Sequence, residues 1–370
     1  MKRQRILLFT LLATLSAPTY AQLKGNLIKA SLVEKGTSKP IPFANVTITN
    51  TTSGTAANAN GEFLIGIENQ HKKERLKISC IGYVSRTFSI DSLNGHLYST
   101  LELNPDLNLL DEIVIKAAPI NPAEIVSKAI DSIASNYFNS PFNMEYYSEI
   151  VATNIATQSE FKLETILFGY SQGYSSFKQK QFEILQRRST GEDQLKSIEY
   201  SYWPTFELHQ VDQIASPFRH GVLNPKQLNK FNLKYSGASL YEADTVFNIE
   251  YEARKPTKEI TGYGIVPKIY KGNIYITTSN FAIVKHEIIT DQFSYIIIYK
   301  KINNKYFPYF VSGERSPTAL RFLSKVRNSL TLKRIETGDV KVVDSKINEF
   351  KNPDEVKYDE TYWTNNYPKE

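Results

Sequence analysis

A histidine and a glutamate three positions apart, His71 and Glu74, have the types and the spacing of two zinc ligands in a His-x-x-Glu pair. A catalytic zinc would also need a third protein ligand and a separate acid or base in a sheltered cleft. The pair lies in the polar run 68–75, which is typical of a solvated loop. Three later histidines stand in no recognisable ligand context, namely His209, His220 and His286, the last of which we expect to be exposed or half-buried. We therefore expect no metal site.

The remaining sequence offers little further chemistry. It contains no Gly-x-Ser-x-Gly elbow, no glycine-rich phosphate loop and no His-Glu-x-x-His motif. Glu145, Glu149 and Glu164 fall in expected strands, but a carboxylate pair for glycoside chemistry is recognised only by its geometry. The single cysteine, Cys80, lies on an apolar face of an expected strand, where a thiol stays protonated and inert. We expect no catalytic residue and no cofactor, and a zinc-dependent or carboxylate-based hydrolase is the third hypothesis.

Composition places the chain among globular proteins, since 41% of its 370 residues are hydrophobic and 22% are charged. The 23 Tyr and 20 Phe, against 2 Met and 2 Trp, favour strands over helix bundles. The formal net charge is +6, but Lys2, Arg3 and Arg5 belong to the N-terminal segment described next. Without them the chain has 41 basic and 38 acidic residues, a dispersed excess that does not indicate nucleic-acid binding.

Residues 1–21 have the pattern of a secretory signal peptide. A basic start is followed by the apolar stretch 6–15 and by small residues that predict cleavage between Ala21 and Gln22. About ten apolar residues are too few to span a bilayer, which needs ~20, and no later segment is long enough to span one. The only cysteine is Cys80, so the signal is not that of a lipoprotein. We expect an exported protein of the periplasm or the outer-membrane surface, with no transmembrane span.

Residues 22–104 alternate short apolar strands with turn signals, as in an all-β sandwich. Asn60-Gly61 is the strongest turn signal, because both central positions of a type I′ turn need positive φ. The landmarks of this segment resemble those of the carboxypeptidase-regulatory-like domain, and that resemblance implies a seven-stranded prealbumin-like sandwich. The domain is an accessory module of secreted carboxypeptidases and bacterial envelope proteins; where it often has Asp, this chain has Asn58. The landmarks are Gly25–Leu27, Lys39–Ile48, Gly54-Thr55, Asn60–Phe63 and Leu76–Tyr83.

Residues 105–120 form a predicted linker or edge strand. Their acidic and apolar stretch resembles the TonB box of TonB-dependent outer-membrane receptors, an extended peptide that binds TonB by strand addition. The resemblance implies a partner-docking strand, and the alternative is an edge strand or docking linker within the protein. The candidate docking residues are Asp111, Glu112, Ile113, Val114 and Ile115.

Residues 121–370 predict an α+β domain in which a helix covers a large antiparallel sheet. Asn121 is the expected N-cap of a helix over 121–138, with Pro122 at its first position and Glu124 completing a capping box. An irregular insert is expected over 189–234. The domain is loosely similar to the half-barrel of periplasmic lipoprotein carriers. The expected strands are 142–152, 161–170, 245–253, 272–278, 283–290, 295–302, 306–314 and 340–350.

The fold class is therefore mainly β, a sandwich followed by a half-barrel-like sheet covered by a helix. The leading hypothesis is a non-enzymatic exported envelope protein that binds or assembles through its sandwich. The alternatives are a periplasmic carrier of a lipid or other apolar ligand in the half-barrel and a TonB-interacting accessory of outer-membrane transport. The partner would be an envelope protein or an apolar or carbohydrate ligand. The deciding observation is whether a cavity lies between the sheet and the 121–138 helix and which side chains line it. The alternative to a ligand there is a concave face filled by this helix and by the sheet's own aromatic residues.

Overall fold

The computed structural model describes residues 26–51, 53–58, 60–67, 69–93, 98–106, 120–176, 180–191, 212–214, 220–242, 244–262, 266–315, 324–343, 356 and 358–366. The expected cleavage site at Ala21 and Gln22 lies outside these residues. So does the candidate docking strand of Asp111, Glu112, Ile113, Val114 and Ile115. Within the described chain, no helix combines the length and the apolar character that crossing a bilayer requires.

The N-terminal part is a seven-stranded sandwich, as the resemblance to the carboxypeptidase-regulatory-like domain implies. One sheet has the order β4-β1-β7 and the other has the order β3-β2-β5-β6. Its core is formed by alternate apolar residues of both sheets, such as Ile28, Val46 and Ile78. Cys80, directly after β5, packs partly buried against this core. The strands are β1 (Asn26–Glu34), β2 (Asn45–Ile48), β3 (Gly54–Ala56), β4 (Glu62–Ile67), β5 (Arg75–Ser79), β6 (Arg86–Ser89) and β7 (Ser99–Leu103), with η1 (Asn69–His71) and α1 (Ile90–Leu93) between them.

The second part is one curved sheet of ten strands, in the order β10-β9-β8-β17-β16-β15-β14-β13-β12-β11. All neighbouring strands are antiparallel, and β17 returns from the end of the sheet sequence to pair with β8. The mainly β prediction is confirmed. The strands are β8 (Phe142–Asn154), β9 (Glu160–Ser171), β10 (Gln181–Gly191), β11 (Phe231–Tyr241), β12 (Asp244–Ala253), β13 (Tyr270–Thr277), β14 (Ile283–Thr290), β15 (Phe293–Ile302), β16 (Lys305–Arg315) and β17 (Ser324–Glu336).

Two details of the expected sheet are wrong. Strands β10, β11 and β17 were not expected, and the expected strand 340–350 has no strand in its described part, 340–343. The expected insert 189–234 overlaps β10, which continues to Gly191, and β11, which begins at Phe231. The three missed strands mix charged and apolar residues, since β10 and β11 are edge strands and β17 has exposed positions along one face. Because charged residues interrupt the apolar ones, these three segments lack the continuous apolar run by which a central strand is recognised in the sequence.

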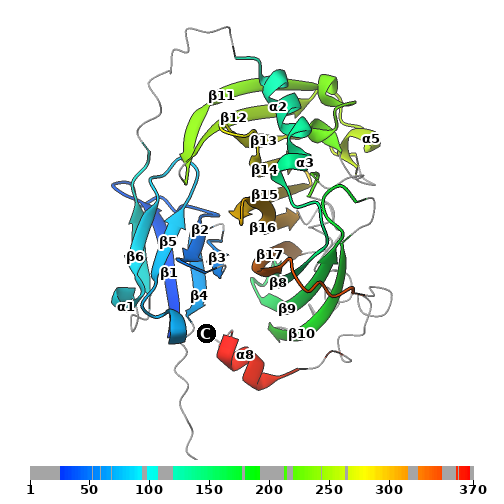
Figure 1. Ribbon diagram of the computed structural model, residues 1–370. Coiled ribbons are helices and arrows are strands. Elements are labelled where there is room, and N and C mark those ends of the chain that lie inside the picture. Colours follow the sequence, from blue (N-terminus) through cyan, green and yellow to red (C-terminus); the bar gives the residue numbers. More distant parts are fainter. Residues whose placement is uncertain are drawn as a thin grey trace, which may run out of the picture.

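The expected helix 121–138 is observed as α2 (Pro122–Asp131) and α3 (Ile133–Asn136). The Asn121 side chain accepts a hydrogen bond from the Ala123 backbone N–H at 3.1 Å, which confirms the predicted N-cap. Figure 1 shows α2, α3 and α5 (Lys258–Thr261) on one side of the large sheet and the sandwich on the other. Both faces of the central strands are therefore covered, and the middle of β16 is buried throughout.

The N-cap of α2 leads to a testable expectation. Replacing Asn121 by Ala removes the acceptor for the Ala123 N–H and should lower the free energy of unfolding by about 1 kcal/mol. Urea denaturation measures this change. Asn121→Asp keeps the acceptor and should stay within a few tenths of a kcal/mol of the natural protein. Equal losses in both variants would contradict a capping role.

Candidate functional site

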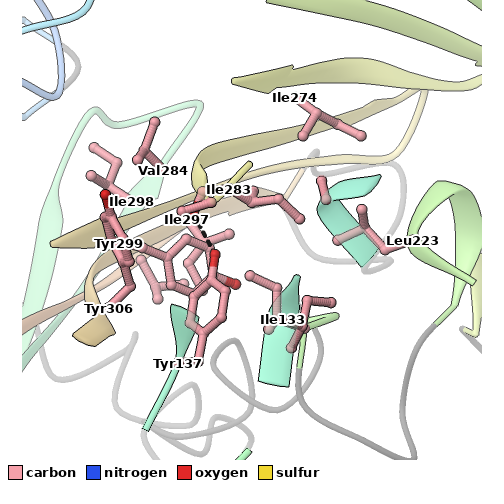
Figure 2. Close-up of a cluster of buried hydrophobic side chains, with 14 of the residues drawn as sticks. Ile133, Tyr137, Leu223, Ile274, Ile283, Val284, Ile297, Ile298, Tyr299 and Tyr306 are labelled. Atoms are coloured by element: carbon pink, nitrogen blue, oxygen red, sulfur yellow. Dashed lines mark hydrogen bonds between the residues drawn. The ribbon is translucent and has the colours of Figure 1, made fainter. Parts of the chain in front are cut away.

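The space between the sheet and its helical cover is centred on Tyr137, which follows α3 (Figure 2). This side chain is only 1% exposed. Its hydroxyl donates a hydrogen bond to the Ile283 carbonyl oxygen at 2.6 Å. The ring lies 5.1 Å from the ring of Tyr174, 5.5 Å from that of Tyr299 and 5.9 Å from that of Tyr306, measured between centroids. Tyr137 therefore fills the space beneath the cover as an aromatic plug.

Other parts of the cover add apolar side chains to the same cluster. They come from one stripe of α2, from α3 and from the short 3-10 helix η3 (Gly221–Leu223), and they meet isoleucines of β13, β14 and β15. Described side chains occupy the space around the helix, as expected for a concave face that the helix and the sheet's own aromatic residues fill. The cover residues are Ile125, Val126, Ala129, Ile130, Ile133, Val222 and Leu223.

A polar group lies within this apolar cluster. The Asp212 carboxylate is 2% exposed, forms an ion pair with Lys180 Nζ at 2.7 Å and accepts a hydrogen bond from the Tyr299 hydroxyl at 2.8 Å. Burial, reinforced by the Asp212 charge, holds the pKa of Tyr299 well above its usual value. The Tyr174 hydroxyl is buried and has no hydrogen-bond partner among the described residues. An apolar enclosure with a few convergent polar groups is the usual composition of a ligand site.

Sequence reasoning missed Lys180, Tyr174 and Asp212. The only local signal for Asp212 is a carboxylate between Val211 and Ile214, and such a pattern is common in surface loops. The three residues meet only in the folded chain, because Lys180 precedes β10 and Asp212 belongs to the insert.

His286 is buried, so the expectation of an exposed or half-buried residue is wrong. It is 1% exposed on β14, and its Nε2 lies 2.9 Å from the Tyr251 hydroxyl oxygen. That hydroxyl donates to the Glu287 carbonyl oxygen at 2.9 Å, so Nε2–H is the donor toward Tyr251. Burial lowers the pKa of His286 to about 3, which keeps the imidazole neutral. The ring stabilises the sheet interior in this neutral form.

The buried imidazole predicts a loss of stability in mild acid. The unfolded chain binds a proton at His286 below pH ~6.5, whereas the folded chain does so only near its lowered pKa. The free energy of unfolding should therefore fall by up to about 1.4 kcal/mol per pH unit as the pH drops below ~6.5. His286→Gln should flatten this slope in urea unfolding between pH 7 and pH 5. An unchanged slope would contradict the neutral, buried imidazole.

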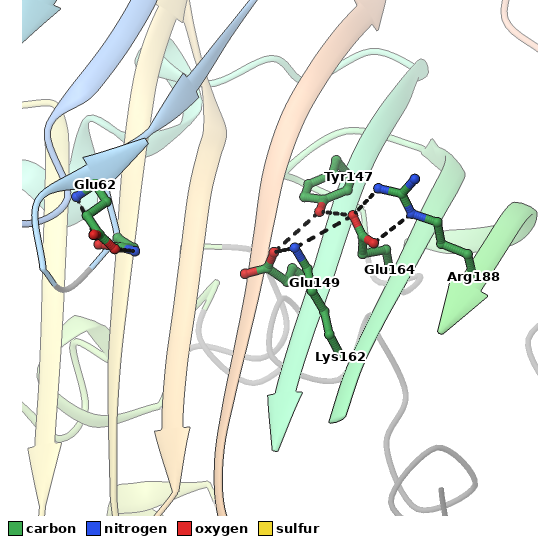
Figure 3. A network of polar contacts seen from close by, with 7 residues as sticks. Glu62, Tyr147, Glu149, Lys162, Glu164 and Arg188 are labelled. Atoms are coloured by element: carbon green, nitrogen blue, oxygen red, sulfur yellow. Dashed lines mark hydrogen bonds and ion pairs between the residues drawn. The ribbon is translucent and has the colours of Figure 1, made fainter. Parts of the chain in front are cut away.

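A network of charges joins β8, β9 and β10 (Figure 3). Arg188 donates two hydrogen bonds to the Glu164 carboxylate, at 2.6 Å and 2.8 Å. Tyr147 donates to the same carboxylate at 2.7 Å, and Lys162 bridges it to Glu149. Burial opposes ionisation, but Arg188, Lys162 and Tyr147 together hold the pKa of Glu164 below its usual value. These carboxylates are thus held by cations in a structural network.

The C-terminal helix α8 (Glu360–Asn366) covers this network. The Arg188 guanidinium lies 4.4 Å from the centroid of the buried Trp363 ring. The Asp359 backbone N–H donates to the Gln186 side chain at 2.9 Å. The third candidate carboxylate, Glu145, lies 3.7 Å from Arg334, and burial raises its pKa.

The His-x-x-Glu pair of the sequence has a structural role at Glu74. Its carboxylate accepts hydrogen bonds from the Thr49 hydroxyl and the Asn50 side-chain amide, each at 2.9 Å. Among the described residues, no group of three or more His, Cys, Asp or Glu side chains could hold a metal ion.

The sandwich packs on the large sheet through residues that the sequence did not single out. Tyr309 donates to the backbone carbonyl of Thr55 at 3.1 Å, and Phe310 lies 6.1 Å from Phe43 between ring centroids. A β-bulge in β16 puts an extra residue at Tyr309, which allows two successive side chains to face the sandwich. A Cβ at Gly54 would overlap the Tyr309 hydroxyl, so glycine is required for this contact.

The sequence of the N-terminal part matches a known domain family at residues 28–115. This segment is a CarboxypepD_reg-like domain. The match confirms the resemblance found in the sequence, and it extends beyond the last strand of the sandwich, β7, to residue 115. No curated protein matches the chain.

Solved structures give low-scoring similarities. A LolA superfamily protein from Nitrosomonas europaea is 9% identical with a TM-score of 0.26, covering 62% of this chain and 97% of its own. A DUF1329 family protein from Desulfovibrio piger is 10% identical with a TM-score of 0.29, covering 63% and 98%. The lipoprotein LppX from Mycobacterium tuberculosis is 8% identical with a TM-score of 0.24, covering 60% and 97%. TM-scores in this range do not establish a shared function.

Proposed function

We propose that the protein is an exported, non-enzymatic carrier that binds an apolar ligand between the large sheet and its α2–α3 cover. The observation that carries this proposal is the polar group of Asp212, Lys180 and Tyr299 enclosed within an aromatic cluster. Aromatic and aliphatic side chains would receive the hydrophobic part of the ligand, and the polar group would fix its orientation.

The cover consists of the short helices α2 and α3, which a ligand could displace from the sheet. Helix α2 has ten residues, α3 has four, and Ser132 separates them without a side-chain cap on α3. A ligand chain would take the place of Tyr137 and the apolar stripe of α2, so one apolar contact would replace another. Each buried CH₂ group of the ligand would contribute about 0.8 kcal/mol.

Lipid extraction tests the proposal. The full chain is expressed with its export signal, purified without detergent from the soluble envelope fraction, and extracted with organic solvent for mass spectrometry. We expect an apolar molecule in near-stoichiometric amount. Lys180→Met should lose it, whereas Lys325→Met, at an exposed ion pair with Glu314, should keep it. An extract without apolar molecules, together with no binding of the fluorescent probe 1-N-phenylnaphthylamine, would overturn the proposal.

Partner docking through Asp111, Glu112, Ile113, Val114 and Ile115 is a second candidate function. It is favoured by the domain match, which reaches residue 115 although the last strand of the sandwich ends at Leu103. An extended segment beyond the sandwich would add a strand to an envelope partner such as TonB. Replacing Ile113 and Ile115 by Pro in the full chain should abolish cross-linking to that partner in cells, because proline cannot donate to a strand ladder. Unchanged cross-linking would exclude this segment.

Export is proposed with cleavage between Ala21 and Gln22. Mass spectrometry of the protein recovered from the envelope should give a chain that begins at Gln22. Leu11→Arg places a charge in the apolar stretch 6–15 and should leave the uncleaved precursor in the cell. An exported chain that keeps residues 1–21 would contradict cleavage at this position.

A further inference from the structure

Three neighbouring hairpins line a second site, an open pocket of about 330 Å³ at the turns that join β11 to β12, β13 to β14 and β15 to β16. The β11–β12 turn, the β13–β14 turn and the β15–β16 hairpin each contribute charged or hydroxyl side chains to its wall. It lies beside the sandwich, because Asn45 of β2 donates a hydrogen bond to the lining residue Tyr241. The lining residues are Tyr241, Glu242, Asp244, Thr277, Ser279, Val284, Lys300, Lys301 and Tyr306.

The two carboxylates of the pocket already have partners within the protein. Asp244 accepts a hydrogen bond from the Ser279 hydroxyl. Glu242 faces the sandwich, where Ser79 donates to it at 3.5 Å and Lys77 lies 4.0 Å away. These acids are therefore engaged by donors of the chain.

The two ammonium groups of the pocket are in a different situation. Neither Lys300 nor Lys301 forms an ion pair with a described residue, and each lies over an aromatic ring. Lys300 Nζ is 4.9 Å from the centroid of Tyr309, and Lys301 Nζ is 6.0 Å from that of Tyr306. A ring face stabilises a cation only in part, so both ammonium groups retain capacity for an anion.

We infer that this pocket binds a small organic anion with a single oxyanion group, held by the ammonium group of Lys300, while the exposed Lys301 adds positive charge at the pocket rim. Tyr241 and Tyr306 would flank the organic part of the ligand. The lining residues carry two positive and two negative charges, and Lys77 beside Glu242 adds a third positive charge next to the pocket. The oxyanion could belong to a free carboxylate or to the phosphodiester of a lipid headgroup, which share this chemistry.

The electrostatics give the site a pH dependence. Burial lowers the pKa of Lys300 to about 8, a shift that Glu242 opposes and Lys77 reinforces. The groups that face the Lys300 amine are Glu242, Lys77, the Tyr309 ring and the other lining residues of the pocket. Anion binding needs the protonated amine, so affinity should fall by up to about tenfold per pH unit above pH ~8.

Titration calorimetry on the chain from Gln22 tests the inference with two probes, butyrate and dihexanoyl-phosphatidylglycerol, and with uncharged butyramide as a control. We expect at least one anionic probe to bind at pH 7, more weakly at pH 9, while butyramide does not bind. Binding of butyrate indicates a free organic acid as the ligand, and binding of the lipid alone indicates a headgroup.

Lysine variants locate the binding. Lys300→Met should weaken binding of the active probe by about tenfold or more, because it removes a charge-assisted contact, and Lys301→Met should weaken it less. Lys271→Met, at an exposed lysine of β13 outside the pocket, should leave affinity unchanged. Circular dichroism checks that each variant is folded. Absence of binding by both anionic probes, or binding unaffected by both pocket variants, would overturn the inference without bearing on the apolar site beneath α2 and α3.

Discussion

Arg188→Met should lower the free energy of unfolding by about 3 kcal/mol, one of the two largest losses that we expect from a single substitution. The side chains of Arg188 and Glu164 are 8% and 6% exposed. Removing the guanidinium leaves the buried Glu164 carboxylate without the bidentate hydrogen bonds that Arg188 donates to it. Lys162, at 3.8 Å, and Tyr147 still compensate the charge in part, so we place the loss at the lower end of the range for broken buried pairs.

Urea denaturation at pH 7 measures this loss, and a surface pair provides the control. Lys128 and Glu124 form an ion pair of 2.8 Å on the exposed side of α2, and Lys128→Met should cost no more than about 0.5 kcal/mol. The double variant Arg188→Met with Glu164→Gln should recover part of the loss, because no buried charge remains. A loss from Arg188→Met as small as that of the surface control would show that the buried pair is not stabilising.

The same network has a defined pH dependence. The pKa of Glu164 is lowered in the folded chain, so its contribution to stability is complete above the carboxyl pKa of the unfolded chain, ~4.3. That contribution disappears as the pH falls through the lowered folded value. The effect of Arg188→Met should therefore be largest at neutral pH and should shrink below pH ~4.

The parts of the fold that the sequence predicts are those with an unbroken local signal. The N-cap at Asn121, the apolar stripe of α2 and the run of Ile296, Ile297 and Ile298 each depend on neighbours within a few residues. Strand β17 lacks such a signal, because Arg327 and Asn328 interrupt its apolar positions. It is nevertheless a central strand, held by β8 on one side and β16 on the other, which only the long-range pairing reveals.

The candidate sites were beyond sequence reasoning for a related reason. Asp212 comes from the insert, Lys180 directly precedes β10 and Tyr299 lies on β15, and no spacing rule connects them. Lys300 has the same dependence on folding, since the sandwich and two hairpins set its surroundings. The motif that did have catalytic spacing, His71 with Glu74, instead supplies a hydrogen-bonded carboxylate to a loop of the sandwich.

Tyr137→Ala should both destabilise the protein and open the space beneath the cover. Removing this buried aromatic ring should cost about 3 to 5 kcal/mol, because three neighbouring rings and the Ile283 carbonyl lose their contact with it. Urea denaturation measures the loss. In the folded variant the vacated volume is lined by apolar side chains, so 1-N-phenylnaphthylamine should bind more tightly than it does to the natural protein.

Tyr137→Phe separates the two effects, because it removes the hydroxyl and keeps the ring. It leaves the Ile283 carbonyl without this hydrogen bond and should cost about 1 kcal/mol, with no gain in probe affinity. If the Tyr137 ring fills the ligand space, the loss in free energy of unfolding and the gain in probe affinity both depend on the volume of the ring and not on the hydroxyl. Equal probe affinity in the Ala and Phe variants would place the apolar ligand elsewhere, even if the stability loss were as large as expected.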